Sequence, residues 1–236
     1  FRDNGGVPPN NLTEFAASSA LSIGEGYWLL TKGTFSFSRS ITAAQLSSDG
    51  THSISVRNGW NIVGNPFDVS VPWGTVKADN QISGNLWTYS GTAGFQTSTT
   101  LEPFKGYYFS SSATSLKIRY PFPTMKMEEV EPPVIDWKLQ LVLEVEGNSD
   151  GENFVGIAPM AKEELDELDQ PKPPVFRDQA FLSMARSSFD GQVKLFSSDF
   201  RPQVGEGQVW SFEVSNPGRS AGKIRILGIG TLPSEH

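Results

Sequence analysis

The chain has 236 residues, of which 37% are hydrophobic and 19% are charged, and it carries a formal net charge of −7. This length suits two domains of ordinary size, and the composition indicates a packed core rather than disorder. Nucleic acids and anionic membranes attract basic surfaces, so a chain with no evident Lys/Arg cluster is expected to bind neither. The absence of cysteine excludes disulfides, thiolate zinc sites and cysteine nucleophiles. The sequence also has no run of about 18 apolar residues that would form a membrane-spanning helix.

Short strands and turns are predicted throughout residues 1–120. Aromatic and aliphatic runs at 26–30 and 106–109, and polar–apolar alternation at 35–38 and 53–56, are typical of strands. We therefore expect residues 1–120 to form one β-sandwich-like module. Its first residues resemble the middle of a module, so an N-terminal strand is expected to be missing.

A change of composition separates this module from a second one. Prolines flank a Met- and Glu-containing stretch at 121–133, and we interpret this stretch as a linker because proline cannot donate to a strand ladder. The second module, residues 134–236, begins with the clearest strand pattern of the chain, at 137–145. Further strands are predicted at 154–157, 180–185, 193–196, 209–214 and 223–229. The predicted fold class is therefore all-β, with two β-sandwich-like modules.

One segment of the second module has a different pattern. Residues 160–169 are acidic and rich in helix-forming residues, and the prolines that follow at 171, 173 and 174 would end a helix. This pattern predicts a single short helical turn on a loop.

The most distinctive motif of the chain is the run at 59–67, Gly-Trp-Asn-Ile-Val-Gly-Asn-Pro-Phe. Glycines permit close backbone approach, and Asn-Pro after glycine favours a turn. We interpret the motif as structural, a core aromatic with a rigid turn; the alternative is a ligand-binding turn. Its defining residues are Gly59, Trp60, Asn61, Gly64, Asn65 and Pro66.

This motif, with the sequences at 24–29 and 103–108, resembles β-rich accessory modules of large secreted Bacteroidetes-type proteins, the kind exported by type IX secretion. The second half resembles such proteins through Trp137 and the sequences at 165–169, 199–202 and 210–212, so the resemblance covers most of the chain but rests on short motifs. It implies an extracellular or cell-surface location and a bacterial source. It brings no activity with it, because such modules are accessories to other domains.

Catalytic chemistry has little support in the sequence. A Ser-His-Asp triad needs a histidine base, and the two histidines are His52, in a predicted turn, and His236, the final residue. Acidic residues cluster at 128–131 and 163–169, but acid catalysis needs one desolvated carboxyl beside an ionised one, and exposed runs do not provide that asymmetry. We therefore predict no enzyme, with a carboxylate-based hydrolase as the remaining alternative, and no cofactor.

A weak calcium site is one of two candidate ligand sites. Asn148, Asp150 and Glu152 alternate beside a glycine, and calcium takes oxygen ligands from such loops. An ordinary polar hairpin turn explains the same pattern.

Carbohydrate binding is the second candidate, because aromatic platforms stack on sugars. Aromatic residues of small β modules usually lie in the core, which is the alternative explanation. The platform candidates are Trp73, Trp87, Tyr89, Tyr107 and Tyr108.

These observations predict a non-catalytic structural or spacer region of a secreted or cell-surface bacterial protein. Its expected partners are the flanking domains of the same parent chain. The alternative is a module that binds carbohydrate or a surface protein, with calcium as a stabilising ion.

Overall fold

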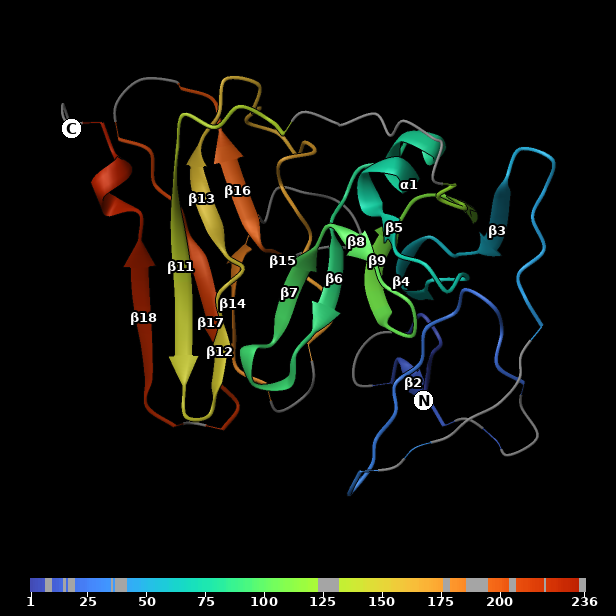
Figure 1. Ribbon diagram of the computed structural model, residues 1–236. Coiled ribbons are helices and arrows are strands. Elements are labelled where there is room, and N and C mark those ends of the chain that lie inside the picture. Colours follow the sequence, from blue (N-terminus) through green and yellow to red (C-terminus); the bar gives the residue numbers. More distant parts are fainter. Residues whose placement is uncertain are drawn as a thin grey trace. The chain divides into compact units, whose positions relative to one another are not determined.

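The computed structural model describes residues 1–6, 10–14, 16, 20–34, 36, 42–122, 132–175, 179–185, 195–203, 207–218 and 220–233. The predicted all-β class is confirmed, since strands dominate the described residues (Figure 1). The chain forms two compact units. The first comprises Phe1–Thr88 and Ser98–Val130, and the second comprises Tyr89–Thr97 and Glu131–His236. Most of the predicted linker, 121–133, lies outside the described residues.

The first unit is built from small antiparallel sheets. The largest has the order β4 (Gly59–Gly64), β9 (Gly106–Ser111) and β6 (Leu86–Tyr89). The 3-10 turn η1 (Gly91–Ala93) and all but the last residue of the strand β7 (Phe95–Ser98), which follow β6 in the chain, belong to the second unit. Three strand pairs complete the unit: β1 (Arg2–Asp3) with β2 (Leu12–Thr13), β3 (Thr51–Ser55) with β10 (Ser115–Arg119), and β5 (Val71–Pro72) with β8 (Thr100–Leu101).

The core of the first unit lies on one face of β9. Tyr107 and Phe109 point into it, and Phe109 meets the ring of Trp73 edge to face at 5.0 Å between ring centroids. Aliphatic residues of β3, β4, β5, β6, β8 and β10 also pack in this core. Tyr108 points to the opposite face, as alternation along a strand requires, and there it packs against Trp28 and Trp60.

The helix α1 (Trp73–Asn80) was not predicted from the sequence. It begins directly after Pro72, whose extended backbone is compatible with a helix start, and it ends at Gln81, which adopts a left-handed conformation. Its buried residues, Trp73 and Val76, are three positions apart and therefore share a face. The Asn80 side chain hydrogen bonds to both backbone groups of Lys117 at 2.7 and 2.8 Å, which fastens the helix to β10.

The second unit has a five-stranded sheet. β11 (Trp137–Val145) pairs on one side with β18 (Gly222–Leu227) and on the other with β12 (Asn148–Asp150) and β13 (Phe154–Ile157). β16 (Ser198–Arg201) extends the sheet by pairing parallel to β13. The bounds of β11 and β13 match those predicted from the sequence.

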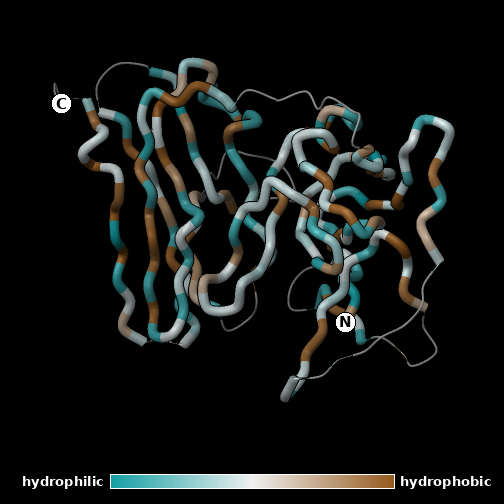
Figure 2. Tube along the Cα trace, in the orientation of Figure 1, coloured by the Kyte–Doolittle hydropathy of each residue, from teal (hydrophilic) through white to brown (hydrophobic). Residues whose placement is uncertain are grey.

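A three-stranded sheet provides the second layer of this unit. It consists of β15 (Leu195–Phe196), β14 (Phe181–Ala185) and β17 (Phe212–Ser215), and the short 3-10 turn η2 (Ile229–Thr231) follows β18. Leu141 and Leu143 of the first sheet share a core with Leu182 and Met184 of the second. Figure 2 shows hydrophobic residues concentrated along β11, the central strand. The unit is thus sandwich-like, with the core between its two sheets.

The prediction of a helical turn at 160–169 was wrong, since these residues form turns and bends. The Asp166 carboxylate accepts hydrogen bonds from the backbone N–H groups of Lys162 and Leu168, both at 2.7 Å. Asp169 is buried and accepts the N–H of Phe200 at 3.2 Å. Aspartate side chains therefore bind the N–H groups of this segment locally, which competes with helix formation.

Gly156 lies where three segments of the second unit crowd together. A Cβ at this position would lie 2.3 Å from the backbone oxygen of Trp137 and 2.9 Å from the Phe200 ring. Gly156→Ala is therefore expected to destabilise the unit by about 1–3 kcal/mol, as overpacking of a filled interior does. The matched control is Gly230→Ala, because a Cβ there meets no atom within 4 Å. Equal urea midpoints for the two variants would contradict the prediction.

Candidate functional site

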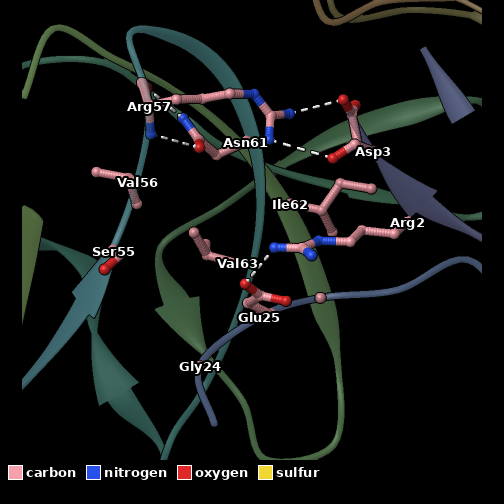
Figure 3. Close-up of a pocket in the computed structure, with 11 residues that line it drawn as sticks. Arg2, Asp3, Gly24, Glu25, Ser55, Val56, Arg57, Asn61, Ile62 and Val63 are labelled. Atoms are coloured by element: carbon pink, nitrogen blue, oxygen red, sulfur yellow. Dashed lines mark hydrogen bonds and ion pairs between the residues drawn. The ribbon is translucent and has the colours of Figure 1, made fainter. Parts of the chain in front are cut away.

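A cavity of about 230 Å³ lies beside β4 in the first unit (Figure 3). Its walls come from β1, the segment 24–26, residues 55–57 at and after the end of β3, and residues 61–63 of β4. Arg2 and Glu25 form an ion pair of 2.8 Å at this cavity. The site therefore brings the N-terminal strand together with residues more than twenty positions away in the sequence.

Asp3 is the most buried charged group of this cavity. It pairs with Arg57 at 2.6 Å, and Arg57 also donates to the backbone oxygen of Asp3 at 3.1 Å. The Tyr108 hydroxyl donates to the other carboxylate oxygen of Asp3 at 3.3 Å and accepts from the Trp28 indole at 3.1 Å. Burial raises the pKa of Tyr108 far above its usual value, so its hydroxyl stays protonated as a donor.

The charges at the cavity neutralise one another in pairs. Each arginine faces one carboxylate, as Figure 3 shows, so the cavity has no unbalanced charge to attract an ionic ligand. The Nε of Arg57 is buried and has no hydrogen-bond partner, so its N–H is a donor that this cluster does not use. These pairs join β1, the segment around Glu25 and the β3–β4 connection, which is a stabilising arrangement. The sequence held no signal for it, because the partners lie far apart in the chain.

The motif at 59–67 uses both of its asparagines to close turns. The Asn61 amide donates to the backbone oxygens of Arg57 and Gly59, and its oxygen accepts the Arg57 N–H at 2.9 Å. Asn65 likewise donates to the backbone oxygens of Val69 and Leu101, at 2.7 and 2.8 Å. Each side chain thereby satisfies several backbone groups that would otherwise be unpaired.

The glycines and the tryptophan of the motif also contact the backbone or side chains of their surroundings. Gly59 has a φ of 86°, which favours glycine, and Gly64 lies against the backbone of Glu25, so that a Cβ would meet its oxygen at 3.1 Å. Pro66 follows Asn65 in the second turn. Trp60 is only half-buried, with its ring against Tyr108 at 6.2 Å between ring centroids. Trp60 therefore differs from the predicted core aromatic, because its ring is covered on only part of its surface.

Four of the five residues predicted to form an aromatic platform are buried. Trp73, Trp87, Tyr107 and Tyr108 are between 2% and 4% exposed. Tyr89 is half-buried and packs edge to face on Phe95 at 5.2 Å. Tyr107 and Tyr108 point in opposite directions but are both covered, because β9 has packed residues on both faces. The four buried side chains therefore pack in the interior, and their rings do not form an exposed platform.

The calcium candidates are separated by the structure. Asp150 is buried and pairs with the Lys172 ammonium at 2.8 Å, so a cation from the chain itself occupies the position next to the carboxylate. Asn148 is exposed, and Glu152 hydrogen bonds to Thr97 at 3.3 Å. Burial raises the pKa of Glu152. Within the described ranges, no group of three or more acidic or histidine side chains lies close enough to hold a metal ion.

Lys172 completes a polar cluster that sequence reasoning missed. Its Nζ donates to Asp150 and to the Oδ1 of Asn153 at 2.7 Å, and all three side chains are buried. The N–H of Leu182 donates to the second carboxylate oxygen of Asp150 at 2.8 Å. The only local signal is a lysine among prolines at 170–174, which does not predict burial.

The remaining catalytic candidates have ordinary surroundings. His52 lies on β3 with its Nδ1 2.9 Å from the backbone oxygen of Gln45. His236 and the acidic residues at 128–131 lie outside the described residues.

No helix in the part of the chain that the structure describes is long and apolar enough to cross a membrane.

Comparison with known proteins adds no family to this description. No family model matches the sequence, and no curated protein and no solved structure matches the chain.

Proposed function

We propose that this chain is a non-catalytic structural region, a spacer, of a secreted or cell-surface bacterial protein. The observation that carries the proposal is the internal use of its buried polar groups. Asp3 and Arg57 join segments of the first unit, and Lys172 and Asp150 join segments of the second. A binding site needs convergent polar groups that remain available to a ligand, whereas these groups bind one another.

The bacterial source and the extracellular location rest on the resemblance of the motif at 59–67. The geometry of that motif supports a structural role, because both of its asparagines bind backbone groups of turns. A region that transmits force or sets distance between other domains benefits from such cross-connections.

The flanking domains of the parent chain are the proposed partners of the second unit. Ile224 and Ile226 of β18 lie opposite Leu143 and Leu141 of β11, so they point toward the core side of the sheet. They are nevertheless exposed, and no other described strand pairs with the outer edge of β18 (Figure 1). A neighbouring domain packed on this apolar edge would remove it from water.

Stretching the purified chain by its two ends in optical tweezers tests the spacer role. We expect two separate unfolding steps, one for each unit, since each unit has its own core. The same steps are expected with calcium or with soluble polysaccharides present, because only a ligand of the folded state stabilises it. Unfolding as one gradual extension, or a saturable rise in unfolding force with one polysaccharide, would contradict the proposal.

A further inference from the structure

Three functional groups meet in the interior of the second unit. The Nζ of Lys172 lies 2.7 Å from the Oδ1 of Asn153 and 2.9 and 2.8 Å from the two carboxylate oxygens of Asp150. The side chains of Lys172 and Asp150 are 5% and 7% exposed, and Asn153 is fully buried. An amine, a carboxamide and a carboxylate are thus enclosed together, away from bulk water.

Backbone pairing holds each of these groups in place. The N–H of Lys172 donates to the oxygen of Leu195 at 3.1 Å, and the preceding Pro171 bridges to Phe196. The backbone oxygen of Asn153 accepts the Leu141 N–H at 2.8 Å, between the pairings of β11 with β12 and with β13. Backbone hydrogen bonds to neighbouring strands therefore anchor the two segments that carry Lys172 and Asn153.

The separation is short enough for a bond to form. A carbonyl bond is about 1.2 Å long, so this hydrogen bond places Nζ about 3–4 Å from the Asn153 Cγ. Reacting atoms in productive complexes lie about 3–3.5 Å apart, and holding them there replaces a large part of the entropic cost of reaction.

We propose that Lys172 and Asn153 join in an intramolecular isopeptide bond, with Asp150 as the group that accepts and returns the proton. This modification is independent of the spacer role, although a covalent cross-link would serve that role.

The reaction needs no partner outside these three side chains. Asp150 accepts a proton from the Lys172 ammonium, and the neutral amine attacks the Asn153 Cγ, which moves an electron pair onto Oδ1. The carbonyl reforms as the Cγ–Nδ2 bond breaks. Nδ2 leaves as ammonia after taking up the second Nζ proton, and the proton held by Asp150 leaves with it as ammonium. One C–N bond forms and one breaks, with no change of oxidation state.

The surroundings favour the reactive forms of these groups. Burial lowers the pKa of Lys172, while the carboxylates of Asp150 and Glu152 oppose this shift. The Asn153 amide is oriented by donating to the backbone oxygens of Leu141 and Asp150 at 3.3 and 3.1 Å. A purely non-covalent ion pair would have the same contacts, so the mass of the protein distinguishes the two states.

The cross-link would close a loop around the acidic segment 160–169. Residues between 153 and 172 could no longer extend under force. The gain in chain length when the second unit unfolds would therefore be about 60–70 Å smaller than without the cross-link.

Intact-mass spectrometry of the denatured full chain tests the proposal. We expect a mass about 17 Da below that of the sequence, because one ammonia is lost. Succinimide formation at an asparagine loses the same mass, so digestion must also yield a branched peptide that joins Lys172 to Asn153. A chain that keeps its full mass after days of incubation, or that loses ammonia without the branched peptide, overturns the proposal.

Three variants and a control assign the roles. Lys172→Met and Asn153→Ala should both abolish the branched peptide and the mass loss. Asp150→Asn, which keeps the shape but removes the carboxylate, should abolish or greatly slow bond formation in protein that circular dichroism shows to be folded. The exposed Lys138→Met should leave the cross-link unchanged. A branched peptide that persists in folded Asp150→Asn at the unaltered rate would remove Asp150 from the mechanism.

Discussion

Replacing Asp150 by alanine is expected to lower the free energy of unfolding of the second unit by about 3–5 kcal/mol, because removal of one partner leaves the other buried and uncompensated. The ammonium of Lys172 would keep only Asn153 as a hydrogen-bond partner. The N–H of Leu182 would lose its acceptor as well. The cost is therefore the desolvation of two donors and not only the loss of one contact.

Hydrogen exchange of β11 and β14 peptides in increasing urea measures this loss within the second unit. Asp136→Ala is the matched control, since Asp136 is an exposed aspartate of the same unit, and we expect a change within about 0.5 kcal/mol. Repeating the measurement in an Asn153→Ala background, which cannot form the cross-link, isolates the ion pair. A loss below about 1 kcal/mol in that background would show that water reaches Lys172.

Phe109→Ala is expected to destabilise the first unit by about 3–5 kcal/mol, the usual cost of truncating a core aromatic residue. Phe109 is fully buried in the centre of β9, and its ring packs edge to face on Trp73. The truncation leaves a cavity beside α1 that rigid strands on either side cannot close. The second unit should keep its stability, because its core is separate.

Phe104→Ala is the control for this change, because Phe104 is 93% exposed and its truncation creates no cavity. Urea unfolding of the three proteins, followed by hydrogen exchange of β4 and β9 peptides, gives the comparison. Similar midpoints for Phe109→Ala and Phe104→Ala would contradict the assigned core.

The strands were the part of the fold that local sequence patterns could predict. Alternation and apolar runs located β11 and β13 with their observed bounds, since these patterns depend only on neighbouring residues. The same reasoning missed α1, because a short helix with Gly74 inside it and only two buried residues has little periodic signal. It also predicted a short helical turn within 160–169, where aspartate side chains bind the backbone N–H groups instead.

The candidate sites were less predictable than the strands, because exposure depends on what covers a residue. An adjacent pair such as Tyr107 and Tyr108 must point to opposite faces of a strand, which left one ring available for a ligand. Asp3 and Trp28, which are far from Tyr108 in the sequence, cover the Tyr108 ring and hydrogen bond to its hydroxyl. The pairing of the calcium candidate Asp150 with Lys172 was equally hard to predict, because the two residues are 22 positions apart in the sequence.

The sequence by itself determined the all-β class and the positions of strands such as β11 and β13. These properties follow from side-chain alternation, turn chemistry and glycine conformation, which act over a few residues. Only the tertiary structure decided which aromatic rings are buried and which charges pair, because those contacts join distant segments. The enclosure of Lys172 with Asp150 and Asn153 belongs to this second group, since it depends on how two sheets close over one loop.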